Sequence, residues 1–170
     1  MNAKSMGTRF FVLVLALIIC IFVGYIAALY TVPSIPWFAK LIKPDLTPPA
    51  WVFQWVWSAL YVMMGVALYG ILQAGIAKKD TLLALIFFAF QLFLNLGWSY
   101  LFFGLHSIFF AFLCIIALWA ILLCTVIQTL KVSVSSAAFL LPYLFWVTFV
   151  TFLNYLIMTL NPISFEIPIF

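Results

Sequence analysis

The longest uncharged segment of the chain constrains the fold most. From Thr81 to Leu130, about 50 residues, there is no Asp, Glu, Lys or Arg. As one helix, at roughly 1.5 Å per residue, this segment would be about 75 Å long, more than twice the hydrocarbon thickness of a membrane. It must therefore fold back once. Its one turn-like cluster is Gly-Leu-His-Ser at 104–107, so one helix ends near Phe103 and the next begins near Ser107.

The composition places the whole chain in a membrane. Of its 170 residues, 69% are hydrophobic and 6% are charged, whereas soluble domains carry about 25% charged residues. So few charges could not cover a water-soluble globule of this size. The composition excludes an ordinary cytosolic enzyme, a disordered chain and a disulfide-rich secreted domain. We therefore expect an all-α integral membrane protein made of one small bundle.

Charges and prolines divide the chain into five membrane-spanning helices. The first apolar run is longer than the hydrophobic region of a signal peptide, about 7–15 residues, so we interpret it as a retained helix. Five prolines from Pro33 to Pro49 make the following loop a stiff, irregular cover outside the hydrocarbon, with room for one helical turn at Trp37–Leu41. The prediction is a single membrane domain over 1–170, a five-helix bundle whose long first loop acts as a lid, with helices at about 10–31, 50–76, 81–103, 107–130 and 135–160, the loop at 32–49 and a tail at 161–170.

The charged residues predict an orientation but no nucleic-acid surface. The formal net charge is +4, and the bases are too scattered to follow a line of phosphates. Five spans place the two termini on opposite sides of the membrane. The positive-inside rule then predicts a cytoplasmic N-terminus, because five bases share that side and two share the other: Lys4, Arg9, Lys78, Lys79 and Lys131 against Lys40 and Lys43.

Polar side chains inside three of the predicted helices follow one face of each helix. In lipid such groups are costly unless they pair or face a cavity. One interpretation is interhelical hydrogen bonding, worth roughly 0.6–2 kcal/mol per residue. The three stripes together favour a pocket for a flat, mostly apolar ligand, walled by indoles and phenols with a few amide anchors. The pocket candidates are Trp57, Tyr61, Asn95, Trp98, Tyr143, Trp146 and Asn154, and the same stripes carry Gln54, Ser58, Gln91 and Ser99.

The residues of conventional catalysis are missing from these helices. Asp45, Asp80 and Glu166 fall in loops or the tail, so no intramembrane carboxylate can relay protons, which disfavours a proton-coupled transporter. His106 is the only histidine and lies at a turn, where we expect a surface position. One histidine and three scattered cysteines cannot build a zinc or haem-iron site. We therefore expect no required cofactor and no side-chain acid–base catalysis.

The sequence resembles the TspO/MBR family, the tryptophan-rich sensory proteins related to the mitochondrial translocator protein, or peripheral benzodiazepine receptor. The resemblance spans nearly the whole chain, in order. It is carried by Trp37 with KPDLTPPAWVF at 43–53, VWSALY at 56–61 and MGVA at 64–67, by Q-x-x-x-N-x-x-WS at 91–99 with FF at 102–103, and by LPY-x-x-W at 141–146 with Phe149 and LNY at 153–155.

The resemblance implies a five-helix bundle, expected to be a homodimer, whose first long loop closes a cavity between the helices. The family binds porphyrins, sterols and synthetic benzodiazepine-type ligands. Its cavity tryptophans resemble Trp57 and Trp146, and its helix-three amide resembles Asn95. Its loop aromatic resembles Trp37, and its helix-one aromatic resembles Tyr25. Sterol-binding members have Tyr and then a basic residue in the fifth helix, which this chain lacks, so a tetrapyrrole is favoured over a sterol.

These observations leave three main functions open. The leading hypothesis is a receptor or sensor, multi-pass in a bacterial inner membrane, that binds a porphyrin in tetrapyrrole handling or stress regulation. The second is an enzyme for light- and oxygen-dependent porphyrin breakdown, which some bacterial family members are reported to promote. The excited porphyrin would make the reactive oxygen, so no acid–base residue is needed. The third is a facilitated transporter of porphyrin or sterol-like ligands, and a structural or partner-assembly role is the remaining alternative.

Overall fold

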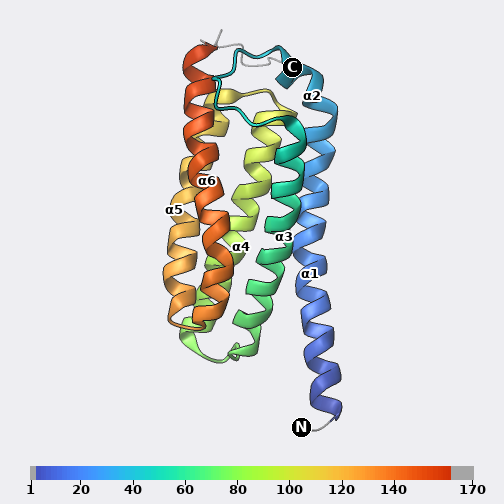
Figure 1. Cartoon of the computed structure of the whole chain (residues 1–170). Coiled ribbons are helices and arrows are strands. Elements are labelled where there is room, and N and C mark those ends of the chain that lie inside the picture. Colours follow the sequence, from blue (N-terminus) through green and yellow to red (C-terminus); the bar gives the residue numbers. More distant parts are fainter. Residues whose placement is uncertain (1–2, 162–170) are drawn as a thin grey trace.

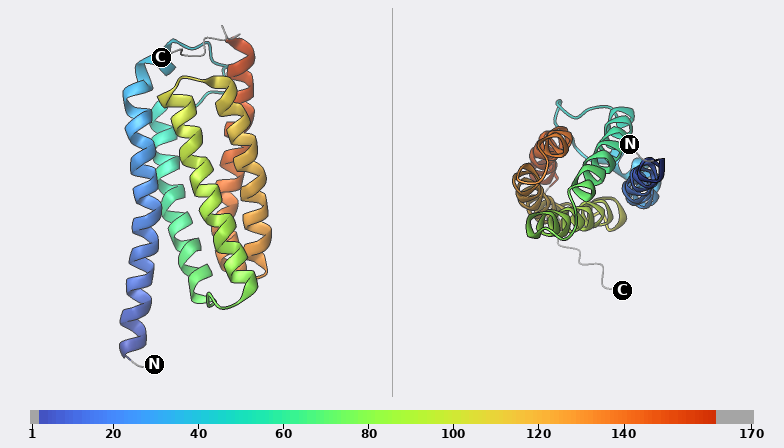
Figure 2. Two further views of the ribbon diagram at one scale, coloured as in Figure 1. Left: turned by 180° about the vertical axis from the view of Figure 1, so that it is seen from behind. Right: turned by 90° about the horizontal axis from the view of Figure 1, so that it is seen from below.

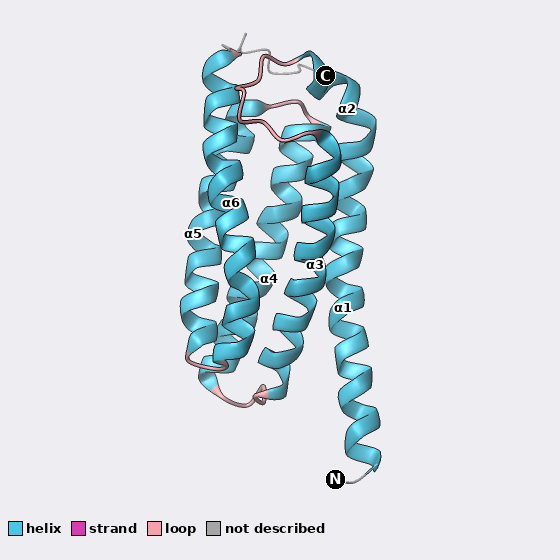
Figure 3. Cartoon of the chain, viewed as in Figure 1, coloured by secondary structure: helices cyan, strands magenta, loops and turns pink. Residues whose placement is uncertain are grey.

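The computed structural model describes residues 3–161, with side chains from Met6 onward. Within this range all regular elements are helical (Figures 1 and 3), and five helices are long and apolar enough to cross a membrane. This confirms the predicted all-α, five-helix membrane bundle. The elements are α1 (Ala3–Thr31), η1 (Val32–Ser34), α2 (Ile35–Lys40), α3 (Ala50–Gln73), α4 (Lys79–Ser99), η2 (Tyr100–Gly104), α5 (Ile108–Leu130) and α6 (Val134–Leu160).

Local sequence explains where several helices begin. Pro33 and Pro36 occupy the first turns of η1 and α2, where a helix does not need the missing backbone N–H. α3 begins directly after Pro49. Ser133 caps α6, because its Oγ accepts a hydrogen bond from the Ser136 N–H at 3.2 Å. Proline and serine thus mark these helix boundaries in the sequence.

Three elements differ from the expectation drawn from the sequence. The first loop, expected as an irregular cover with one helical turn at Trp37–Leu41, is helical earlier, in η1 and in the short helix α2. The second span was expected to reach residue 76, and its helix ends at Gln73. The third span changes at Tyr100 into the π-helical turn η2, in which the Leu105 N–H donates to the Tyr100 carbonyl at 2.8 Å. Single π turns of this kind are common at functional sites. The predicted tail lies outside the described residues after Asn161.

The long helices enclose an interior with α1 at its edge. α4 packs along α5, α5 along α6 and α6 along α3, while α1 lies against α3 and α4 (Figure 2). The α3–α4 and α5–α6 turns lie at the same end as the N-terminus, here called the turn end. α2 and the first loop lie at the opposite end, here called the cap end (Figure 1). Lys78, Lys79 and Lys131 therefore belong to the turn end, and Lys40 and Lys43 to the cap end.

The turn-end half of the bundle is solid and largely apolar, although it also buries polar side chains such as Gln91, Thr129 and Ser136. α1 closes onto α3 there because Gly65 has no side chain: a Cβ at this position would lie 2.9 Å from the Leu17 Cα. Close packing of this kind drives helix association in lipid. Side chains from α3, α4, α5 and α6 fill the space between those helices and are at most 2% exposed: Met64, Ile71, Phe88, Leu122 and Leu140.

Hydrogen bonds fasten the first loop to the end of α6 and hold its turn after α2. Asn161, after the end of α6, binds both backbone groups of Ile42: its Oδ1 accepts from the N–H at 3.0 Å, and its Nδ2 donates to the carbonyl at 2.8 Å. Lys43 Nζ donates to three backbone carbonyls near the C-terminus of α2, including that of Phe38 at 2.8 Å. The loop therefore follows a fixed course across the helix ends.

Candidate ligand-binding pocket

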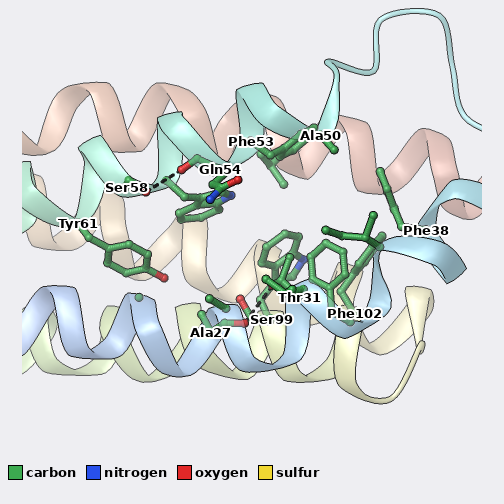
Figure 4. A pocket seen from close by; sticks show the side chains of 18 of the residues that line it. Ala27, Thr31, Phe38, Ala50, Phe53, Gln54, Ser58, Tyr61, Ser99 and Phe102 are labelled. Carbon is green, nitrogen blue, oxygen red and sulfur yellow. Dashed lines mark hydrogen bonds between the residues drawn. The ribbon is translucent and has the colours of Figure 1, made fainter.

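The cap-end half of the bundle contains a pocket of about 630 Å³. α1, α3, α4 and α6 form its walls, and residues of η1, α2 and η2 line it toward the cap (Figure 4). Sites for small organic ligands typically have volumes of about 300–1,000 Å³. The residues that line this pocket are mostly apolar, and none of them is charged. The pocket is therefore suited to an apolar ligand of substantial size.

A chain of hydrogen bonds between three helices forms the floor of the pocket. The Tyr61 hydroxyl on α3 donates to Asn95 Oδ1 on α4 at 2.6 Å, and Asn95 Nδ2 donates to the Tyr143 hydroxyl on α6 at 2.8 Å. All three side chains are buried. Gly24 on α1 makes room for the Tyr61 ring, since a Cβ there would lie 2.5 Å from Tyr61 Cδ2. The buried network fixes this ring in place.

Two indoles and a phenyl ring form an aromatic wall above the floor. Trp57 and Trp98 stack with ring centroids 5.9 Å apart, and Trp98 stacks on Phe102 at 5.6 Å. Trp98 Nε1 donates to Asn154 Oδ1 at 3.1 Å, while Asn154 Nδ2 donates to the Ile108 carbonyl at 3.2 Å. The indole of Trp98 is thus held by α6 as well as by its own helix. This wall offers a flat ligand an ordered surface for stacking.

A further aromatic stack joins the cap, which consists of α2 and the first loop, to the turn between η2 and α5. Trp37 lies on the His106 ring with centroids 4.1 Å apart and planes 11° apart, and it meets Phe102 edge-on at 5.6 Å. His106 Nε2 lies 3.3 Å from Ser34 Oγ, which donates to the Phe103 carbonyl at 2.6 Å. His106 is exposed, as expected, but it takes part in this contact. The cap therefore touches the pocket wall through Phe102 and Phe103.

The chemistry available in the pocket is binding and stacking. Its lining holds no carboxylate, histidine, lysine or cysteine, so it offers no acid or base suited to proton transfer near neutral pH. Over the described part of the chain, no group of three or more His, Cys, Asp or Glu side chains could hold a metal ion. Recognition must therefore rest on ring surfaces and on a few neutral polar groups.

The sequence of the chain is similar to those of several known membrane proteins of one family. The sequence profile of the TspO/MBR family matches residues 15–160. The tryptophan-rich protein TspO of Chlorobaculum tepidum is 37% identical over 158 residues, which cover 92% of this chain and 100% of that protein. The chain belongs to the TspO/MBR family. The TspO protein of Archaeoglobus fulgidus is 36% identical over 150 residues, 88% of this chain and 96% of its own. The translocator protein of Homo sapiens is 34% identical over 120 residues, 70% of this chain and 71% of its own.

In this TspO/MBR bundle some of the predicted site residues line the pocket and others support it. The lining includes Tyr25, Trp57, Tyr61, Trp98 and Asn154. Two further candidates lie outside the lining and hold the floor instead, through the hydrogen bonds that fix Tyr61: Asn95 and Tyr143. Their polarity is used for pairing between helices, which was the alternative interpretation of the polar stripes.

The two remaining candidates also lie outside the pocket lining. Trp37 belongs to the stack in the cap. Trp146 on α6 packs against Phe53 and Phe149, with ring centroids 5.4 Å apart in each pair, and its indole Nε1 is buried without a hydrogen-bond partner among the described residues. Phe53 itself lines the pocket. Trp146 thus supports a lining residue, because the Phe53 ring holds the position next to the cavity.

Sequence reasoning missed two kinds of lining residue. Gln54, Ser58 and Ser99 lie on the predicted polar stripes but were not among the pocket candidates. The spacing of Gln54, Ser58 and Tyr61, three to four residues apart, could have identified the first two as neighbours of Tyr61 on one helix face. The lining face of α1 consists largely of small residues such as Gly24 and Ala28, which a search for aromatic and polar side chains does not detect.

Proposed function

We propose that the protein is a membrane receptor or sensor that binds a tetrapyrrole in the cap-end pocket. The observation that carries the proposal is the aromatic wall, in which Trp57, Trp98 and Phe102 stack in series along the cavity. A flat conjugated ring system gains both from stacking on these rings and from burial of its apolar surface. The uncharged lining favours such a molecule over a polar metabolite.

Titration of the purified protein with protoporphyrin IX, followed by quenching of tryptophan fluorescence, tests this proposal. Replacing Trp57 and Trp98 with Phe reduces the stacking surface, and each change should weaken binding about two- to tenfold. Trp55→Phe is the matched control, because Trp55 is on the same helix but is 72% exposed and outside the lining. Unchanged affinity in the Trp57/Trp98 double variant would remove the site assignment.

Light- and oxygen-dependent breakdown of a bound porphyrin is the second candidate function. It is favoured by two indoles, Trp57 and Trp98, that stand in the lining where they would contact the ligand and the oxygen species that an excited porphyrin generates. Illumination of the complex should then give a ring-opened product, detected by mass spectrometry, that depends on Trp57. Bleaching at the rate of free porphyrin in detergent contradicts this activity.

A facilitated transporter of porphyrin or sterol-like ligands is a weaker alternative. The hydrogen-bonded floor at Tyr61 and the apolar side chains of the turn-end half occupy the route through the bundle. Transport would require the floor to open. A flux of porphyrin into proteoliposomes that is abolished by Tyr61→Trp would favour this alternative, because the larger ring would obstruct the floor.

We infer the membrane setting from the distribution of charge. The turn end carries more bases than the cap end, so the N-terminus is expected in the cytoplasm of a bacterial cell, with the bundle in the inner membrane. We further expect a homodimer and no nucleic-acid partner. Replacing Lys79 or Lys40 with Cys and labelling intact cells from outside tests the orientation, and only the cysteine at position 40 should react. Light scattering of the purified protein tests the dimer.

A further inference from the structure

Half of the ten polar side chains in the pocket lining have hydrogen-bond partners within the protein. Thr31 and Ser58 donate to backbone carbonyls of their own helices. Tyr61 and Trp98 donate to the oxygens of buried amides. Asn154 uses both its oxygen and its nitrogen in hydrogen bonds to other residues. A ligand could bind these groups only by competing with existing hydrogen bonds.

Among the five lining residues whose polar groups have no partner in the described structure, Ser99 at the end of α4 is the buried one. The others are exposed or half-buried: Tyr25, Trp51, Gln54 and Trp57. The Ser99 side chain is 5% exposed and lines the pocket, and its hydroxyl has no hydrogen-bond partner in the part of the chain that the structure describes. A helical serine often satisfies its hydroxyl with the carbonyl one turn earlier. Ser99 does not, and the helix changes to the π turn η2 directly after it. Its oxygen can therefore accept from, and its proton donate to, a molecule in the pocket.

Gln54 is the only amide among these unpartnered lining groups of the described structure, and it approaches the pocket from α3 as an exposed residue. Figure 4 shows its side-chain amide on the opposite side of the cavity from Ser99. The amide has no partner among the described residues. Gln54 lies in the second turn of α3, where its amide is free to turn toward a ligand. It lies one turn before Trp57, and Ser99 directly follows Trp98, so each group lies next to an indole of the aromatic wall along its own helix.

The absence of charged residues from the lining restricts which ligand group can lie beside Gln54 and Ser99. No lysine, arginine or histidine is among its lining residues, so nothing there balances an ionised carboxylate. In the cap, Lys43 directs its Nζ to three backbone carbonyls. An unpaired charge in an apolar site costs far more than a neutral polar group that is hydrogen-bonded. An amide and a hydroxyl each suit a neutral carbonyl or hydroxyl group.

We propose that Gln54 and Ser99 each hold an uncharged carbonyl or hydroxyl group of the ligand, from opposite sides of the cavity. The Gln54 Nε2 and the Ser99 hydroxyl donate to two different ligand oxygens, and the Gln54 Oε1 accepts from a ligand hydroxyl. The pair selects neutral oxygenated ring systems over alkyl-only rings and over ionised acids. This inference rests on the proposed ligand-binding function and assigns the polar part of that recognition.

Three porphyrins of the same ring size test the proposal on the full chain in detergent. They are protoporphyrin IX dimethyl ester, etioporphyrin, which carries only alkyl groups, and ionised protoporphyrin IX. Wild-type protein should bind the dimethyl ester more tightly than either of the others. Gln54→Leu and Ser99→Ala should each reduce the affinity for the ester about two- to tenfold and leave the affinity for etioporphyrin unchanged.

The same substitutions at exposed positions outside the pocket provide matched controls. Gln73→Leu on α3 and Ser135→Ala on α6 should change neither affinity. Equal losses for the ester and for etioporphyrin would mean that Gln54 and Ser99 act through packing, and unchanged ester binding would mean that they do not touch the ligand; either result overturns the inference. Tighter binding of the ionised acid overturns the selectivity for neutral groups. If wild-type protein binds none of the three porphyrins, the proposed function itself fails.

Discussion

The turn-end and cap-end halves of the bundle use α3, α4 and α6 in opposite ways. In the turn-end half these helices pack with α5 around aliphatic and phenyl side chains that leave no exposed surface, such as Met64 and Leu140. In the cap-end half they surround a pocket of about 630 Å³. The boundary is the hydrogen-bonded layer through Asn95. The contrast shows that a layer of paired polar groups can mark where a membrane bundle changes from a core to a binding site.

The difference in side-chain chemistry explains why the cap-end half stays hollow. Aliphatic side chains can shift to fill a space, whereas a ring that is hydrogen-bonded at its far end cannot. Tyr61 and Trp98 are held in this way by Asn95 and Asn154. Small residues on α1, such as Gly24, leave the space opposite these rings unfilled. The cavity is therefore a property of anchored aromatic rings facing small residues.

Phe88→Ala should have the largest effect on stability, because it creates a cavity in the solid half. Phe88 is 2% exposed among aliphatic side chains, and truncation of such a ring costs about 3–5 kcal/mol. SDS-induced unfolding followed by circular dichroism measures the loss. Phe93→Ala on the same helix is the control, because Phe93 is 68% exposed and should cost far less. Equal losses for the two variants would contradict the distinction between the halves.

Asn95→Leu should have the next largest effect, because it acts at the boundary between the halves. The change leaves the Tyr61 and Tyr143 hydroxyls buried without their shared partner, which should lower the free energy of unfolding by about 1–3 kcal/mol. Porphyrin affinity should also fall, since the Tyr61 ring is no longer fixed. Tyr143→Phe is the comparison: it removes one hydrogen bond but keeps Tyr61 bonded to Asn95. If it weakens porphyrin binding as much as Asn95→Leu does, Asn95 does not position the floor.

The fold could be predicted from the sequence because lipid leaves few alternatives. Charges at Lys78 and Lys131 and the proline-rich segment after Pro33 interrupt the apolar runs, and each run is long enough for one span. The π turn η2 could not be predicted, since FFG at 102–104 carries no signal that separates it from an ordinary helix end. The sequence indicates a helical turn at Trp37–Leu41 but not that α2 begins at Ile35, because Pro36 interrupts a helix elsewhere yet is compatible with its first turn.

The candidate site was only partly predictable, because a polar stripe identifies a helix face and not the partner of each residue. Asn95 and Trp98 lie one turn apart on α4, yet only Trp98 lines the pocket. Asn95 points into the layer between helices, where Tyr61 and Tyr143 come within hydrogen-bond distance. That distance depends on how three helices pack together, which no single segment encodes. Trp146 lies outside the lining for the same reason, since Phe53 from another helix stands next to the cavity.

Asn161→Ala should have the smallest effect on stability and the clearest effect on ligand exchange. The change removes both hydrogen bonds to Ile42, which fasten the cap to the end of α6, and should cost about 1 kcal/mol. The pocket floor and the aromatic wall are unchanged, so a bound porphyrin still stacks on the same rings. It should dissociate about fivefold faster, because the cap is no longer fastened, and stopped-flow fluorescence measures this rate. Asn161→Asp keeps the acceptor for the Ile42 N–H and should give an intermediate rate. Equal dissociation rates in all three proteins would mean that the cap does not control access, and the cap-end half would then differ from the turn-end half only in its cavity.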